Sequence, residues 1–222
     1  ATLYFHDHLN NHFVKTNKLY IVFSNNINLE VLSLLMLFSN KYSFIKLRKF
    51  EKSLSTNDLE SEFLTKITTA NQAKNLLNSN LCLLLSLNSR YEGSKLNIDL
   101  RKRYFKGNFK LLNLGSAINL TFPSFNIGLN VKNLQSIVEG NNLLCQEFIS
   151  SQNPLIITNS SLFQRKDTNG LVNILKYFKQ ILTKYHLNWD NLSILNSSIN
   201  EAGVNYLNTF KSISEKDLNS SC

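Results

Sequence analysis

Short apolar runs alternate with amphipathic stretches along most of the chain, and this alternation is the main guide to the fold. Each run is short and rich in Leu, Ile or Val, which is typical of a strand buried on both faces of a sheet. The predicted strands are residues 19–24, 43–47, 81–87, 109–115, 154–159 and 191–196.

Helical periodicity fills the gaps between these runs. The longest predicted helix follows Gly170, where one apolar stripe is formed by Leu171, Ile174, Leu175, Phe178, Ile181, Leu182 and Tyr185. Other helices are predicted over 29–40, 95–106 and 130–140, with two polar helical pieces between 58 and 80. Strands that alternate with helices are typical of a parallel sheet covered by helices. We therefore predict one Rossmann-like α/β domain over residues 19–210, between tails at 1–18 and 211–222.

Composition adds a hint about the source and weakens the argument from charge. Asn, Leu, Lys, Ser, Ile and Phe are abundant, whereas the 222 residues include only 7 Gly and 2 Pro, and this bias indicates an A+T-rich genome such as that of an organelle. The net charge of +9 would favour an anionic partner, but codon bias also enriches Lys. No apolar run approaches the roughly 20 residues of a membrane span, so we expect a soluble chain.

The cysteines and histidines do not form a pattern typical of a disulfide framework, a metal site or a catalytic thiol. Cys82, Cys145 and Cys222 are far apart, so they form neither a disulfide framework nor a CxxC metal site, and a reducing compartment is expected. Cys82 lies inside a predicted strand, where a thiol acts as a small hydrophobe. The terminal cluster His6, Asp7, His8 and His12 places two histidines four residues apart, as metal ligands can be, but a solvated tail is the favoured interpretation.

Glycine-rich phosphate loops are absent from the sequence. The turn after the first predicted strand, residues 24–28, has no Gly, whereas a dinucleotide site needs G-x-G-x-x-G. Glu92 is the one acidic residue near the predicted carboxyl edge of a strand, and we favour an ion pair with Arg90 or with the helix over 95–106. His186 ends a predicted helix, where a cation suits the helix dipole. We predict no catalytic, cofactor-binding or metal-binding residue.

Four segments, in order along the chain, carry a family resemblance. They are marked by Asn88, Arg90, Glu92, Asn97, Leu100, Arg101 and Lys102; by Thr121, Phe122, Pro123 and Gly128; by Pro154, Leu162, Gln164, Arg165, Asp167 and Gly170; and by Trp189, Gly203 and Leu207. Together they resemble the C-terminal, molybdopterin-oxidoreductase-like part of the large iron–sulfur subunit of respiratory complex I. The chain departs from that pattern at Ser89, Gly93 and Ser94, where the family has Pro, Ala and Pro, and at Asp99, where it has Arg.

The resemblance implies a non-catalytic scaffold that has lost its molybdopterin and holds no cofactor. The Cys-rich, cluster-bearing region of the family does not occur in these residues, so we expect a separately encoded C-terminal fragment from a split mitochondrial gene. It would lie in the peripheral arm of complex I, on the matrix side of the inner membrane. Its partners would be the cluster-bearing N-terminal fragment, which carries electrons from NADH to ubiquinone, and other peripheral-arm subunits, with no nucleic acid and no direct insertion into the membrane.

Two alternatives stay open. The first is a basic organelle nucleic-acid-binding protein, such as a mitochondrial ribosomal subunit. In that case Arg101, Lys102, Arg103, Lys106 and Lys110 would contact phosphates, with the rings of Tyr104 and Phe105 nearby. The second is an oxidoreductase that keeps molybdopterin chemistry, which the Gly-poor loops disfavour.

Overall fold

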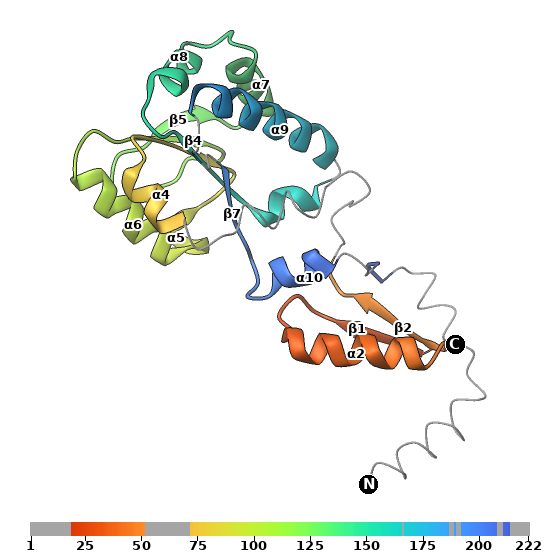
Figure 1. The fold of residues 1–222 in the computed structure, drawn as a ribbon. Helices are drawn as coiled ribbons and strands as arrows, with labels where there is room; N and C mark the ends of the chain where they lie inside the picture. Colours follow the sequence, from red (N-terminus) through yellow and green to blue (C-terminus); the bar gives the residue numbers. More distant parts are fainter. Residues whose placement is uncertain are drawn as a thin grey trace. The chain divides into compact units, whose positions relative to one another are not determined.

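Two compact units make up the chain in the computed structural model, which describes residues 19–51, 72–165, 167–186, 189, 192–207 and 211–213 (Figure 1). One unit combines residues 1–54 with 198–222, and the other covers residues 55–197. The predicted domain over 19–210 spans both, and its boundaries stay a prediction. The histidine cluster at 6–12, Cys222 and the predicted tail at 1–18 lie outside the described residues, as do residues 58–71 of the predicted helical region at 58–80 and residues 214–222 of the predicted C-terminal tail.

A five-stranded parallel sheet is the centre of the larger unit, which confirms the predicted α/β class. Its strands run in the order β5-β4-β3-β6-β7. They are β3 (Leu81–Leu85), β4 (Lys110–Leu114), β5 (Phe125–Gly128), β6 (Leu155–Asn159) and β7 (Leu192–Leu195), and every neighbouring pair is parallel. All five side chains of the central strand β3 are buried. A strand covered on both faces needs apolar residues at every position, which explains the run LCLLL.

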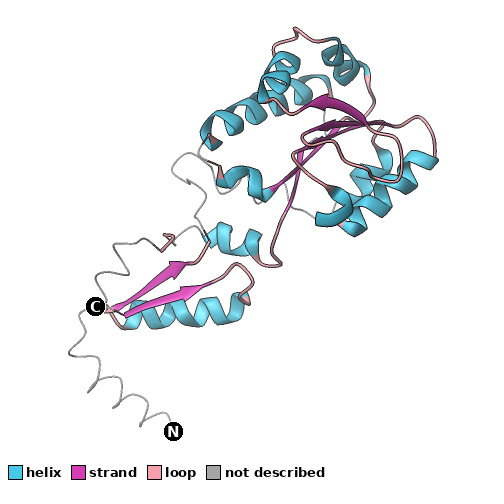
Figure 2. Cartoon of the chain, turned by 180° about the vertical axis from the view of Figure 1, so that it is seen from behind, coloured by secondary structure: helices cyan, strands magenta, loops and turns pink. Residues whose placement is uncertain are grey.

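Helices cover both faces of this sheet (Figures 1 and 2). One group is α4 (Gln72–Asn78), α5 (Ser89–Glu92) and α6 (Ser94–Phe105), and the other is α7 (Val131–Val138), α8 (Leu143–Ser150) and α9 (Thr168–Tyr185). A short 3₁₀ helix, η1 (Ser160–Gln164), follows β6. Leu76 of α4 and Leu100 of α6 pack with Leu84 of β3 in one apolar core. The predicted helices over 95–106, 130–140 and after Gly170 are confirmed within a few residues.

The smaller unit has a two-stranded parallel sheet of β1 (Leu19–Phe23) and β2 (Ile45–Lys49). Helix α2 (Leu29–Lys41) connects the two strands, and α10 (Glu201–Leu207) returns from the far end of the sequence. Phe23, Leu32, Leu47 and Val204 form the core of this unit. A Cβ atom at Gly203 would lie 2.7 Å from a methyl carbon of Leu29, so glycine lets α10 and α2 approach closely.

Several described elements were not predicted, among them the short helices α5 and η1, the strand β5 and the helix α10. β5 is only four residues long, begins two positions after Pro123 and ends at Gly128, so its sequence is typical of a loop. Its pairing with β4 also includes a register shift at Asn113 and Leu114, so no regular alternation marks it. Within the described ranges, no helix has the length and apolar character needed to cross a bilayer.

Candidate functional site at the carboxyl edge of the larger sheet

The carboxyl ends of β3 and β6 are side by side because these strands are parallel neighbours. In open α/β sheets this edge is where ligands usually bind. The segment with Arg90 and Glu92 begins here, as the short helix α5 directly after β3. This edge is therefore the candidate functional site.

Five polar residues at this edge bond with one another or with the adjacent backbone, and we call them the edge cluster: Ser89, Glu92, Asn97, Asn159 and Ser160. A carboxylate oxygen of Glu92 accepts a hydrogen bond of 2.7 Å from the amide nitrogen of Asn159. The hydroxyl of Ser89, which is fully buried, contacts the amide oxygen of Asn97 at 3.1 Å. The backbone N–H of Ser197 donates to the hydroxyl oxygen of Ser160 at 3.2 Å.

The edge cluster therefore ties together α5, α6, β6, η1 and the segment after β7. Asn159 also caps η1, because its side-chain oxygen accepts the backbone N–H of Ser161 at 3.2 Å. Asn88, immediately before α5, has a buried side-chain oxygen without a hydrogen-bond partner. Most hydrogen-bonding groups of the edge cluster thus bond to other segments of the protein.

The predicted ion pair of Glu92 is wrong. Its partner is the neutral amide of Asn159, and the segments come together because β6 lies next to β3. Arg90 instead donates to the backbone carbonyl of Asn119 at 3.3 Å, and its guanidinium lies 5.8 Å from the ring centre of Tyr91. Arg90 and Glu92 are close in sequence, but each bonds to a different and more distant segment of the chain.

Arg103 has a structural role that the sequence interpretation missed. Its side chain is buried and donates to the backbone oxygens of Ser79 and Gly107, both at 2.7 Å. It also donates to the side-chain oxygen of Asn80 at 2.8 Å and to the backbone oxygen of Asn108 at 3.3 Å. A guanidinium used in this way is unavailable to a phosphate.

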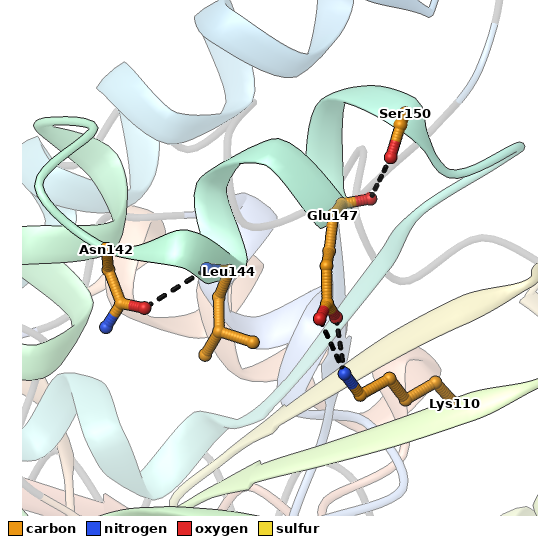
Figure 3. Close-up of polar contacts among 5 residues, drawn as sticks. All are labelled: Lys110, Asn142, Leu144, Glu147 and Ser150. Carbon is orange, nitrogen blue, oxygen red and sulfur yellow. Dashed lines mark hydrogen bonds and ion pairs between the residues drawn. The ribbon is translucent and has the colours of Figure 1, made fainter.

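The other four candidate phosphate contacts are exposed, and two of them lie close to a carboxylate. Lys110 of β4 points to Glu147 of α8 and binds its carboxylate at 2.6 Å (Figure 3). Lys102 is exposed and lies 3.9 Å from Asp99 on the same helix. Arg101 and Lys106 are exposed. The predicted row of five phosphate-binding cations is therefore broken at Arg103 and Lys110.

Cys82 is completely buried in β3, and this burial raises the pKa of its thiol far above the ordinary value. The thiol therefore stays protonated at neutral pH and is a poor nucleophile, in line with the interpretation from the sequence. Among the described residues, no group of three or more His, Cys, Asp or Glu side chains is placed to hold a metal ion.

The third family segment contributes an exposed ion pair after η1. Both guanidinium contacts from Arg165 reach the Asp167 carboxylate, at 2.8 Å and 2.9 Å. The hydrogen bond from Arg165 lowers the pKa of Asp167, and the reciprocal bond raises the pKa of Arg165. Exposed pairs of this kind contribute little to stability.

Buried charges in the smaller unit were also missed. Lys49 at the end of β2 and Glu201 at the start of α10 are both almost fully buried. The ammonium of Lys49 donates to the side-chain oxygen of Asn205 at 3.1 Å. Burial lowers the pKa of Lys49, and the carboxylates of Glu201 and Glu51 oppose that shift. In a Lys-rich chain, nothing in the sequence distinguishes Lys49 from its solvated neighbours.

Comparisons with known proteins agree with the four segments. The profile of the family described as Molybdopterin oxidoreductase matches residues 3–221. The NADH-ubiquinone oxidoreductase 75 kDa subunit of Reclinomonas americana is 31% identical over 159 residues, which are 70% of this chain and 22% of that protein. An NADH-quinone oxidoreductase subunit of Rickettsia typhi is 24% identical over 164 residues, or 69% of this chain and 24% of that protein. The chain thus spans about a quarter of the length of these relatives.

Among solved structures, a chain of the formyltransferase/hydrolase complex (FhcABCD) from Methylorubrum extorquens, crystallised with methylofuran, has the same kind of fold. The TM-score is 0.58, with 10% sequence identity, and the match covers 86% of this chain and 56% of that chain. At this identity the likeness concerns the fold alone.

Proposed function

Because this chain belongs to the molybdopterin oxidoreductase family, and its relatives include large subunits of NADH-ubiquinone oxidoreductases, we propose that it is a structural, non-catalytic part of mitochondrial respiratory complex I. The observation that carries the proposal is the 31% identity to the 75 kDa subunit, over 70% of this chain. The resemblance in the segments around Arg90, Pro123 and Arg165 supports it at the level of motifs.

The family name raises the question of a pterin cofactor at the carboxyl edge of the sheet. A molybdopterin carries a phosphate, and a phosphate needs cations or free N–H donors. Here Glu92 brings a carboxylate to the edge, and this carboxylate already accepts one amide N–H of Asn159. A Cβ atom at Gly93 would lie 3.0 Å from a methyl carbon of Leu195, so apolar packing reaches the start of α6. The edge cluster does not fit an anionic pterin, which supports a scaffold.

In this proposal the chain lies in the peripheral arm of the complex, on the matrix side of the inner membrane. Its partners are the cluster-bearing N-terminal fragment of the same subunit, which carries electrons from NADH to ubiquinone, and other peripheral-arm subunits. The exposed cations Arg101, Lys102 and Lys106 would face acidic neighbours or solvent. The A+T-rich composition supports an organelle gene.

Affinity purification from native membranes tests the proposal. The tagged chain should migrate with complex I on a native gel, and mass spectrometry of that band should find the chain together with cluster-bearing subunits. The chain purified by itself should contain neither stoichiometric iron nor pterin and should not oxidise NADH. Migration apart from complex I, or a stoichiometric pterin on the isolated chain, would refute it.

The nucleic-acid alternative loses support from the side chains that it needs. Arg103 is buried and committed within the protein, and Lys110 forms a surface ion pair with Glu147, so two of the five phosphate contacts already have partners. Binding of the isolated chain to a labelled RNA, with affinity falling steeply as salt rises, would favour that alternative.

A further inference from the structure

Helix α2 of the smaller unit has two apolar sides. One side is centred on Leu32, which is completely buried and packs with Phe23 and Leu47. The opposite side, which we call the outer face, consists of Val31, Leu34, Leu37 and Phe38. Leu34 lies three positions after Val31, and Leu37 and Phe38 lie three and four positions after Leu34, so the four side chains share one side of the helix. They are 46%, 56%, 64% and 45% exposed, respectively.

A surface of this kind indicates a binding partner. A helix that is apolar on all sides is normally buried, and contiguous exposed apolar patches mark interaction sites. Residues 31–38 include no charged side chain, so the outer face has no charge along its length. A water-facing helix of the same length would carry charged or polar residues at these positions.

The two-stranded sheet of the smaller unit also has exposed apolar residues. Parallel sheets are normally covered on both faces, and this one has only the strands β1 and β2. Val22 of β1 and Phe50, just after β2, are exposed as well. The described elements of the smaller unit therefore leave an apolar surface that suits a permanent contact, because permanent interfaces are more apolar than transient ones.

We propose that the outer face of α2 binds the part of the same subunit that corresponds to the relatives' sequence outside the matched region. The relatives from Reclinomonas and Rickettsia have more than three quarters of their length outside that region. A contact between two parts of one subunit is permanent, which agrees with the uncharged character of the face. This inference rests on the proposed function, since it assumes that the chain assembles with the rest of such a subunit.

Photo-crosslinking identifies the occupant directly. The variant Leu37→p-benzoylphenylalanine places a crosslinker on the outer face, and Tyr177→p-benzoylphenylalanine places one on α9, where the side chain is exposed to a similar degree. In the intact complex, position 37 should crosslink several-fold more than position 177, to the polypeptide that carries the rest of the relatives' sequence. A crosslink to a second copy of this chain or to a different subunit, or a yield no higher than at position 177, would overturn the inference.

Charge substitution gives an independent test. The double variant Leu34→Glu/Leu37→Glu should keep its circular dichroism spectrum, because Glu is a good helix former and both positions are exposed. Its incorporation into the complex should fall by about tenfold or more, since a charge cannot be buried in an apolar contact without cost.

The matched control is Tyr177→Glu/Tyr185→Glu on α9, which changes two exposed residues of the other unit and should assemble normally. Normal incorporation of the α2 variant would refute the inference alone. Absence of the wild-type chain from complex I is a different result, because it would refute the proposed function itself.

Discussion

The guanidinium of Arg103 joins two turns of the larger unit, the one before β3 and the one after α6. It donates to Ser79 and Asn80 on one side and to Gly107 and Asn108 on the other. A signal for its burial was present in the sequence, because Leu96, Leu100 and Arg103 lie on one face of the helix. Because Arg103 lies among other basic residues, its charge favoured an exposed position in the sequence interpretation.

We expect Arg103→Ala to lower the free energy of unfolding by about 3 kcal/mol, because it leaves buried carbonyl groups without their charged donor. Arg103→Lys should recover only part of this loss, since an ammonium cannot reach several acceptors in the fixed geometry of a guanidinium. Urea denaturation measures both.

The control is Arg101→Ala on the exposed side of the same helix, which should change the free energy of unfolding by less than about 0.5 kcal/mol. Equal losses for the two alanine variants would contradict the structural role of Arg103.

Glu51 makes the smaller unit sensitive to acid. Burial acts to raise the pKa of this carboxyl, but hydrogen bonds from the backbone of Asn25 and the hydroxyl of Ser24 outweigh it, so the pKa is lowered from its ordinary 4.5. A lowered folded-state pKa means that the ionised group stabilises the fold above the ordinary value, and this contribution is lost as pH falls through the lowered pKa.

The expected result is a drop in the stability of the smaller unit below about pH 4.5. Glu51→Gln should be less stable at neutral pH and should lose less stability on acidification than the wild type. Hydrogen exchange of β1 and α2 peptides, measured in native buffer and in mild acid, gives the comparison. An identical acid response in both proteins would exclude Glu51 as its source.

At the scale of elements, two aromatic rings pack α8 against α9. Phe148 and Phe178 are buried, and their ring centres are 5.1 Å apart in an edge-to-face arrangement. The periodicity of α9 predicted the buried side with Phe178, because helical spacing determines which residues share a face, whereas Tyr185 at the end of the same predicted stripe is exposed. The partner ring could not be predicted, because it depends on how α8 is placed over the sheet.

Phe178→Ala should therefore lower the free energy of unfolding of the larger unit by about 3–5 kcal/mol, through lost burial and the cavity that remains. Phe178→Leu should have a smaller effect. Tyr177→Ala, one residue away on the exposed side, serves as the control and should have little effect in the same thermal or urea unfolding experiment. Similar losses at positions 177 and 178 would contradict the assigned orientation of α9.

Prediction from the sequence succeeded where a segment's own pattern determines its structure and failed where distant segments determine it. The β3 strand has five buried residues in a row, so its type was readable. Glu201 and Gly203 have meaning only beside Lys49 and Leu29, which lie about 150 residues or more away in the sequence. The edge cluster has the same character, since Glu92 meets Asn159 through sheet order.

At the scale of the whole molecule, the chain has separate cores in its two units. Leu32 is at the centre of one, and Leu84 and Leu100 belong to the other. We expect Leu32→Ala to cost about 2–5 kcal/mol in the smaller unit. Hydrogen exchange should accelerate in β1, α2 and β2 and remain unchanged in β3 and β6. Equal acceleration in both sets of strands would show that the units unfold as one.

The single tryptophan of the chain gives this two-unit arrangement a spectroscopic consequence. The indole N–H of Trp189 donates to the backbone carbonyl of Pro154 at 2.9 Å, next to the start of β6. Its fluorescence therefore reports on the larger unit. If the outer face of α2 is the binding surface, the environment of Trp189 should stay unchanged on binding, whereas a probe placed on α2 should report it.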